Sequence, residues 1–531
     1  MDETQETAFQ REVEVAQAAG IIALGNIASR VLGVVRDTVK ANLFGAAGSL
    51  SAYEVAALVP TMIYDLLVGG MSNAALVPVL SDYTAPERRA ELWHLLGRLL
   101  SLVVVALSVF VLLAEVLAPQ IVWLLGGGLT PDLQALATRL LRICVPAVLF
   151  LNLAGVVSGT LYALKRFAFP AFTAAVFNAA VVVAALLLSK RWGVASLAVG
   201  LLVGSILQIV LQWPGLRDVR WRFALDLSHP ALRRIMRLYV PIFLGLMVDQ
   251  SAVALSYNLA SRTGGRSINW MRYSATLIQF PLGLIATAVS IAILPMLSRQ
   301  ATGGRPGLFK DTLARGLRLV LALTIPAMVG LWVLATPIIA LVFEHGGFTP
   351  ADTLATVAAL RCHLVGLIFA AVDQPLIFAF YARKDTWTPA LVGVATVILY
   401  VILALAPILV VSLTLNGLIL ANSLKLVAHA LIMLVLLQHR IGGLSGHGMW
   451  GLVFRVAVAS AVMGGAVHLV VEGMARVVPA GLVGEALLVG GGGLAGAAIY
   501  GVLAVLLRVE EVGLLGRALL EWGRRLTGPG R

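Results

Sequence analysis

Long apolar runs separated by short polar connections fill this chain from end to end. A transmembrane helix needs about 20 mostly apolar residues, and runs of that length recur throughout. They predict fourteen membrane-spanning helices near 17–42, 52–80, 93–117, 133–163, 169–189, 194–215, 235–261, 268–298, 312–343, 353–382, 388–411, 415–437, 449–471 and 482–507. The connections are too short to hold a soluble domain, so we expect function within the membrane or at its faces.

Composition supports this interpretation. Of 531 residues, 60% are hydrophobic and 12% are charged, whereas soluble domains have roughly 45–50% and about 25%. A soluble enzyme, a disordered protein and a disulfide scaffold are excluded. Cys144 and Cys362 lie in apolar runs and are interpreted as packed side chains. The polar, acidic start at 1–16 lacks the basic region of a cleaved signal, so we expect the first apolar run to be retained.

The net charge of +13 follows from membrane topology. With both termini in the cytoplasm, 23 basic residues of the connections and tails lie on the cytoplasmic side and 5 on the other, which is the usual bias of cytoplasmic loops. No nucleic-acid partner is needed to explain the charge. The segment 509–526 has apolar residues at helical spacing and a basic end. It predicts a helix on the anionic membrane surface, or alternatively a solvated tail helix.

An internal repeat relates the two halves of the chain. The stretch 117–131 resembles 334–350, and 162–165 (YALK) matches 381–384 (YARK), at an offset of about 219 residues. This shift spans six predicted helices, so both copies face the same way across the membrane. We therefore predict an all-α polytopic fold with a cavity between two lobes, where alternating access would operate. Its parts are an N-terminal lobe (17–215), a cytoplasmic linker (216–234), a C-terminal lobe (235–437), two further helices (449–507) and a cytoplasmic tail (508–531).

The first predicted span carries an unusual density of polar residues, namely Asn26, Ser29, Arg30, Arg36, Asp37 and Lys40. On a helix, Arg30, Asp37 and Lys40 fall within an arc of roughly 80°, and Arg36 lies about 40° beyond. Such a face could line a hydrated cavity and present guanidinium groups to phosphate oxygens. Alternatively, these charges pair only with one another near a helix end.

Other ionisable residues lie inside predicted spans, where an unpaired charge is costly. We expect them either to line the cavity or to form structural ion pairs; they are Glu54, Asp65, Asp249, Asp373 and Lys425. His429 is interpreted as a packing residue. The sequence has neither a metal-ligand cluster nor a phosphate-binding loop, so we expect no metal, no cofactor and no nucleotide hydrolysis.

The residues 29–37 (SRVLGVVRD) and 44–46 (FGA) resemble the opening of the MurJ/MviN family of lipid II flippases. This family belongs to the multidrug/oligosaccharidyl-lipid/polysaccharide exporter superfamily. The stretches 59–60 (VP), 70–80 (GMSNAALVPVL), 280–283 (FPLG) and 293–298 (ILPMLS) extend the resemblance over nearly the whole chain.

The resemblance implies a transporter rather than an enzyme. Its cargo would be lipid II, the undecaprenyl-pyrophosphate-linked disaccharide-peptide, moved from the inner to the outer leaflet of the bacterial plasma membrane for peptidoglycan synthesis. Membrane lipids and wall-synthesis proteins are the other implied partners. By position, Arg30, Arg36 and Asp37 match charged cavity residues of the family, flanked by Asn26 and Ser29. Arg272 lies about one turn from the position of a further family arginine.

The chain also departs from the family pattern. Ser51 stands where the family usually has Asp, Tyr64 and Asp65 stand where it has basic residues, and Ser256 replaces a carboxylate that some members use for sodium. Two alternatives therefore stay open. One is an exporter of another lipid-linked glycan or amphiphile, and the other is a non-transporting scaffold for wall-synthesis enzymes.

Overall fold

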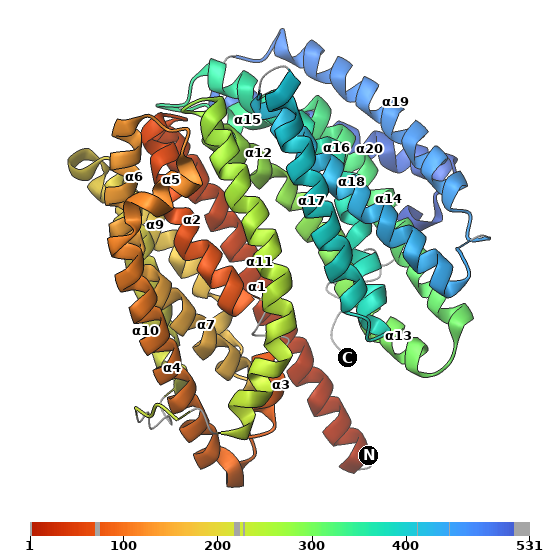
Figure 1. Cartoon of the computed structure of the whole chain (residues 1–531). Coiled ribbons are helices and arrows are strands. Elements are labelled where there is room, and N and C mark those ends of the chain that lie inside the picture. The colour runs from red at the N-terminus through yellow and green to blue at the C-terminus, as the bar shows by residue number, and fades with distance from the viewer. Residues whose placement is uncertain are drawn as a thin grey trace. The chain divides into compact units, whose positions relative to one another are not determined.

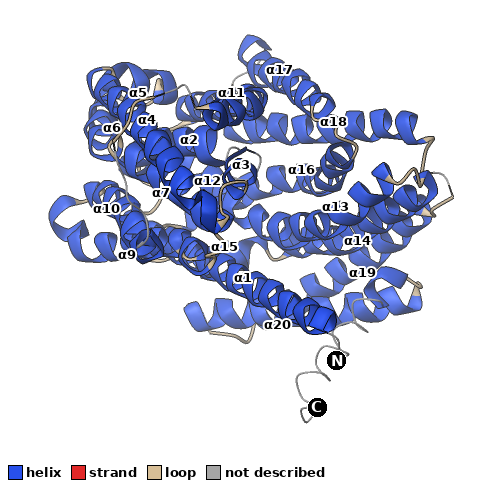
Figure 2. Cartoon of the chain, turned by 90° about the horizontal axis from the view of Figure 1, so that it is seen from below, coloured by secondary structure: helices blue, strands red, loops and turns tan. Residues whose placement is uncertain are grey.

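The computed structural model describes residues 3–69, 75–216, 223–226, 229–410, 413–444, 446–479 and 481–513. Every regular element in these ranges is helical (Figure 2), which agrees with the predicted fold class. The chain divides into two compact units. The first comprises 1–269 with Gly346–Phe348, and the second comprises 270–345 with 349–531.

The first unit contains eleven α-helices in its described part (Figure 1). Their bounds are α1 (Glu3–Phe44), α2 (Gly48–Tyr64), α3 (Val77–Ser81), α4 (Arg89–Val116), α5 (Ala118–Gly126), α6 (Pro131–Cys144), α7 (Ala147–Ala163), α8 (Ala168–Ala171), α9 (Thr173–Trp192), α10 (Ala195–Gln212) and α11 (Pro230–Thr263). One buried cluster joins α3, α4, α7 and α11 through residues such as Leu80, Leu95, Val156 and Ile235. Helix α1 packs along α9 and α8, and this contact positions the charges described below.

The second unit is built from the remaining helices, and its described part contains α12 (Ser267–Pro281), α13 (Thr287–Thr302), α14 (Pro306–Val333), α15 (Ala335–Phe343), α16 (Pro350–Ala382), α17 (Trp387–Val410), α18 (Leu415–Ile441), α19 (Met449–Ala475) and α20 (Leu482–Leu506). Helices α16 and α18 pack side by side. A buried cluster with Leu313, Leu376 and Met433 joins them to α14. A second cluster with Val456 and Tyr500 packs α19 and α20 onto α14.

The predicted spans agree well with the observed helices. Within the described residues, twelve helices are long and apolar enough to cross a membrane, and thirteen when α6 and α7 count as one bent span. The predicted span at 17–42 lies in α1 and is not among them. Its described part includes the charged residues Arg30, Arg36, Asp37 and Lys40. The figure of fourteen spans is therefore approximate.

Prolines interrupt three of the predicted spans. Pro60 lies inside α2, which passes into the π-helical turn η1 (Asp65–Gly69), and Pro281 ends α12 just before the π-turn η5 (Leu282–Ala286). A proline within a helix removes one backbone hydrogen-bond donor, and its ring clashes with the carbonyl one turn earlier, which kinks the helix. At Pro146 the predicted span 133–163 bends by 41° between α6 and α7.

The internal repeat is visible in backbone detail. Helices α5 and α15 each have nine residues and follow a leucine with nearly the same dihedral angles, Leu117 (φ −87°, ψ 10°) and Leu334 (φ −86°, ψ 9°). Lys165 and Lys384 both adopt the left-handed conformation, with φ of 59° and 61°. A lysine rarely occupies this region, so the shared conformation marks equivalent turns.

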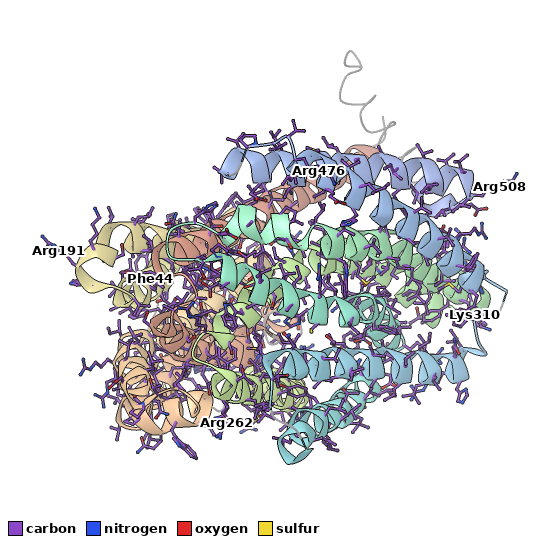
Figure 3. The ribbon with its side chains drawn as sticks, turned by 90° about the horizontal axis from the view of Figure 1, so that it is seen from above. Phe44, Arg191, Arg262, Lys310, Arg476 and Arg508 are labelled. Carbon is purple, nitrogen blue, oxygen red and sulfur yellow. The ribbon has the colours of Figure 1, made fainter. Side chains whose placement is uncertain are left out.

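The two compact units separate after Asn269, because α11 packs against α3, α4, α5 and η1. The lobe boundary in 216–234 stays a prediction. Residues 217–222 of the linker and 514–531 of the tail lie outside the described residues. Basic residues predicted to lie in connections are found at helix ends, as with Arg191 in the last turn of α9 and Arg508 just after α20 (Figure 3).

Candidate functional site

Charged residues of the first predicted span form a buried cluster with a charged residue of the second span, within the first unit. Asp37, Lys40 and Glu54 expose only 3%, 3% and 4% of their surface. The Lys40 ammonium lies 2.5 Å from Oε1 of Glu54 on α2 and 3.4 Å from Oδ1 of Asp37. It also stands 5.7 Å from the ring centroid of Tyr53. These contacts connect α1 to α2 through charge rather than through apolar packing.

Arg36 belongs to the same cluster but reaches toward α9. Its Nε and Nη2 lie 3.0 Å from Oδ1 of Asp37, and its Nη1 donates to Oδ1 of Asn178 at 3.0 Å. The amide of Asn178 in turn donates to the carbonyl of Ser29 at 3.1 Å. The guanidinium is thus oriented from two sides while 23% of the side chain stays exposed.

The four ionised groups balance one another. Arg36 and Lys40 supply two positive charges, and Asp37 and Glu54 supply two negative ones. Pairing of this kind offsets the desolvation of buried charges. We predicted either a cavity-lining face or mutual pairing for this span. The structure shows the pairing, and it leaves 23% of the Arg36 side chain exposed.

Arg30 and Asn26 lie nearer the N-terminus of α1 than Arg36 does. They are one turn apart from each other, and both are exposed. Ser29 is half-buried, and its carbonyl accepts the bond from Asn178. The sequence did not single out Asn178. The feature that could have identified Asn178 is its amide side chain within the apolar run of the fifth predicted span, where a polar side chain needs a hydrogen-bond partner.

The remaining predicted cavity charges are distributed over both units. Asp65 begins η1 and Asp249 lies on α11, and both are exposed parts of the first unit. Arg272 on α12 and Lys425 on α18 are half-buried in the second unit. Asp373 on α16 lies 2.8 Å from Nδ1 of His429 on α18. The interpretation of His429 as a packing residue missed this pair.

Polar contacts also surround one position where the chain departs from the family pattern. The Ser51 hydroxyl donates to the carbonyl of Gly265 at 2.6 Å and accepts from the Asn269 amide at 3.0 Å. Ser51 is fully buried, so these bonds satisfy a neutral hydroxyl where a carboxylate would bring a charge. In the described part of the chain, no group of three or more His, Cys, Asp or Glu side chains could hold a metal ion.

Comparison with known proteins places this chain in a family. The family model described as lipid II flippase MurJ matches residues 40–485. The lipid II flippase MurJ of Burkholderia cenocepacia is 30% identical over 380 residues, covering 70% of this chain and 74% of that protein. The probable lipid II flippase MurJ of Vibrio cholerae serotype O1 is 31% identical over 485 residues, covering 89% and 92%. This chain belongs to the lipid II flippase MurJ family.

Solved structures agree with this assignment to the MurJ family. A lipid II flippase MurJ in an inward closed conformation matches with a TM-score of 0.77 and 25% identity, covering 92% of this chain and 98% of that one. An inward-facing multidrug resistance MATE family transporter of the MOP superfamily matches with a TM-score of 0.66 and 14% identity, covering 78% and 95%. The second likeness shows a shared fold.

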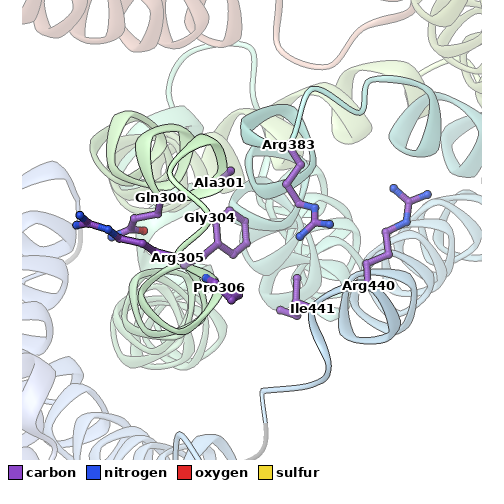
Figure 4. Close-up of a pocket in the computed structure, with 9 residues that line it drawn as sticks. Gln300, Ala301, Gly304, Arg305, Pro306, Arg383, Arg440 and Ile441 are labelled. Atoms are coloured by element: carbon purple, nitrogen blue, oxygen red, sulfur yellow. The ribbon is translucent and has the colours of Figure 1, made fainter.

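In this MurJ-family chain, a pocket of about 290 Å³ lies in the second unit (Figure 4). Residues from the α13–α14 connection and the ends of α16 and α18 line it, including Gln300, Arg305, Phe309, Arg383 and Arg440. The Arg383 guanidinium lies 6.0 Å from the ring centroid of Phe309, and Arg440 pairs with Asp385. Basic residues from three predicted cytoplasmic connections are therefore gathered at one end of this unit.

Proposed function

We propose that this chain is a transporter that moves lipid II from the inner to the outer leaflet of the bacterial plasma membrane by alternating access between its two lobes. The observation that carries this proposal is the oriented guanidinium of Arg36, on a side chain that is partly exposed, in a chain that belongs to the lipid II flippase MurJ family. The charge bias of the connections supports cytoplasmic termini.

The chemistry of the cargo explains why arginine suits this position. A pyrophosphate cannot leave the headgroup layer without groups that replace its hydration. An arginine fork can bind phosphate oxygens through two parallel hydrogen bonds. In this proposal Arg30 and Arg36 bind the pyrophosphate and Arg272 contributes a third guanidinium. Asp37 orients Arg36, Asn26 and Ser29 flank the site, and the polyprenyl tail stays in lipid.

A second candidate is an exporter of another lipid-linked glycan or amphiphile in the same superfamily. The observation that favours it is the uncharged network at Ser51, together with Tyr64 and Asp65 at positions where basic residues are usual. A scaffold for wall-synthesis enzymes has less support, because it would not require a charged cluster within α1.

Lipid binding to the purified protein separates these candidates. We expect lipid II to bind, undecaprenyl pyrophosphate to compete with it, and a neutral polyprenol not to compete. The Arg36→Ala variant should bind lipid II at least tenfold more weakly, since hydrogen bonds to charged groups contribute about 1.5–3 kcal/mol. Preferential binding of a different lipid-linked glycan would favour the second candidate. Absence of lipid binding would favour the scaffold.

A further inference from the structure

A histidine and an aspartate form a pair between two helices of the second unit. Helices α16 and α18 run side by side (Figure 1), and both are long and apolar enough to cross a membrane. Nδ1 of His429 lies 2.9 Å from Oδ1 and 2.8 Å from Oδ2 of Asp373. The two side chains expose only 13% and 12% of their surface. This is a largely buried ionisable pair between two candidate membrane spans, and ionisable side chains inside membrane spans usually have a function.

The geometry determines how this pair can hold protons. A carboxylate accepts hydrogen bonds, so the Nδ1–H of His429 donates to Asp373 and Nε2 is left to bind a further proton. With a neutral imidazole the pair carries one negative charge. Protonation at Nε2 gives an imidazolium beside the carboxylate, and the net charge becomes zero. One proton therefore changes the charge of the pair from minus one to zero.

The surrounding groups allow this change to be assigned to the pair. The titratable or charged residues on α16, α18 and the helices in contact with them, α12 included, are Arg272, Tyr273, Arg299, Lys310, Asp311, Arg315, Arg318, Asp352, Arg361, Cys362, His363, Tyr381, Tyr400, Lys425, His439 and Arg440. Helix α15 and the turn η5 contribute none. Along either helix, Lys425 alone lies within one turn of the pair.

We propose that the His429–Asp373 pair is a proton-binding site that couples transport to a proton gradient. The proposal rests on the transport function proposed above and supplies its driving ion. Proton binding from the acidic outer side and release to the cytoplasm would switch the charge of the pair between zero and minus one. A change of charge inside an apolar bundle changes the cost of burying the pair, so the two protonation states stabilise different conformations of the second unit.

The test uses the full-length protein in vesicles that contain lipid II, with and without an imposed pH gradient. We expect the gradient to accelerate lipid II flipping several-fold in the wild type. His429→Gln and Asp373→Asn should flip at the rate seen without a gradient and should not respond to one. His439→Gln, an exposed histidine in the last turn of α18, is the matched control and should respond like the wild type.

A second measurement does not depend on the cargo. Titration of the purified protein in detergent counts the protons bound between about pH 5 and 8, the range in which histidine ordinarily titrates. We expect the His429→Gln variant to bind about one proton fewer than the wild type, and His439→Gln serves again as the comparison. Equal proton uptake by wild type and His429→Gln would overturn the proposal.

Other outcomes separate this proposal from the proposed function. Lipid II flipping by the wild type at a rate independent of the gradient would overturn proton coupling and leave the flippase function standing. Slower flipping with an unchanged gradient response in both variants would make the pair structural only, and would also overturn the proposal. A wild type that binds the extra proton but does not flip lipid II would instead contradict the proposed cargo.

Discussion

The guanidinium of Arg36 is held in place by the carboxylate of Asp37 and the side-chain amide of Asn178. Asp37 takes two of its nitrogens, and Asn178 accepts from the third while also bonding the carbonyl of Ser29. The carboxylate and the amide fix the direction in which the remaining N–H groups point. Precise orientation of a binding group can be as important to transport or catalysis as the group itself.

Asn178 therefore has a positioning role that can be tested. Asn178→Leu keeps a similar volume and removes the acceptor, and we expect flipping to fall by about ten- to a hundredfold, in line with about 1.5–3 kcal/mol for a hydrogen bond to a charged group. Ser189→Ala near the other end of α9 is the control, and membrane levels of both variants should equal the wild type. Full activity of Asn178→Leu would show that the Asn178 amide does not position Arg36 for transport.

The buried Lys40–Glu54 pair makes a prediction about stability. Lys40→Met leaves Glu54 in a buried position without its closest cation, and breaking a buried pair in this way typically costs about 3–5 kcal/mol. We expect a clearly lower melting temperature in detergent. The double variant Lys40→Met/Glu54→Gln should recover most of the loss, since no buried carboxylate is then left unpaired. Equal melting temperatures for the single and double variants would contradict this account.

A connection outside the spans predicts a dependence on pH. Partial burial would raise the pKa of Asp385, but hydrogen bonds from the backbone N–H and hydroxyl of Thr388 and from Arg440 lower it to about 2. An unfolded aspartate titrates near 3.9. The stabilisation is therefore complete above about pH 4 and is lost as the pH falls toward 2. The difference in melting temperature between wild type and Asp385→Asn should be constant from pH 5 to 8 and should shrink below pH 4; a difference that grows on acidification would refute it.

At the scale of elements, the approach of α1 to α8 depends on a glycine. A Cβ built on Gly25 would lie 2.2 Å from the carbonyl oxygen of Ala171, whereas one built on Gly20 in the same helix has nothing within 4 Å. Because backbone atoms cannot move aside as a flexible side chain can, α1 would have to shift away from α8.

Gly25→Ala should consequently lower the melting temperature and reduce flipping, because the charged cluster is on the displaced helix. Overpacking of this kind typically costs about 1–3 kcal/mol. Gly20→Ala should match the wild type or be slightly more stable, since alanine favours helix over glycine. Indistinguishable stability of the two variants would show that α1 does not depend on this close contact.

Much of the element structure was predictable because apolar run length determines where helices can cross a membrane. The repeat was predictable from Tyr, Lys, Pro and Gly at matching positions, and Lys165 and Lys384 confirm it by their shared left-handed conformation. The π-turns after Pro60 and Pro281 were not predictable. They depend on which neighbouring groups form hydrogen bonds to the backbone carbonyls that proline leaves without a partner. The packing of α11 against α5 and η1 was not predictable, because packing partners leave no local pattern in the sequence.

The candidate site was predictable only in part. The charges of α1 stood out because they interrupt an apolar run. The pairings themselves were not predictable, since Lys40 and Glu54, Arg36 and Asn178, and Asp373 and His429 are separated in sequence and only folding brings the two members of each pair together. Single polar residues inside apolar spans are therefore better interpreted as one half of a pair whose other half has to be found in the structure.

For the whole molecule, two features support the proposed function: membership of the MurJ family and the oriented guanidinium of Arg36. The chain spans 92% of a curated Vibrio cholerae relative and 98% of a solved MurJ chain, so the whole architecture is shared. The function proposed for it depends on lipid II as the cargo and on Arg36 as one of its binding groups.

The most direct test is complementation of bacteria depleted of their own lipid II flippase. The wild-type chain should restore survival and lipid II exposure on the outer leaflet. Arg36→Ala, at an equal level in the membrane, should fail in both, and Arg36→Lys should rescue weakly because it keeps the charge but loses the fork. Failure of a well-expressed wild type, or full rescue by Arg36→Ala, would contradict the account.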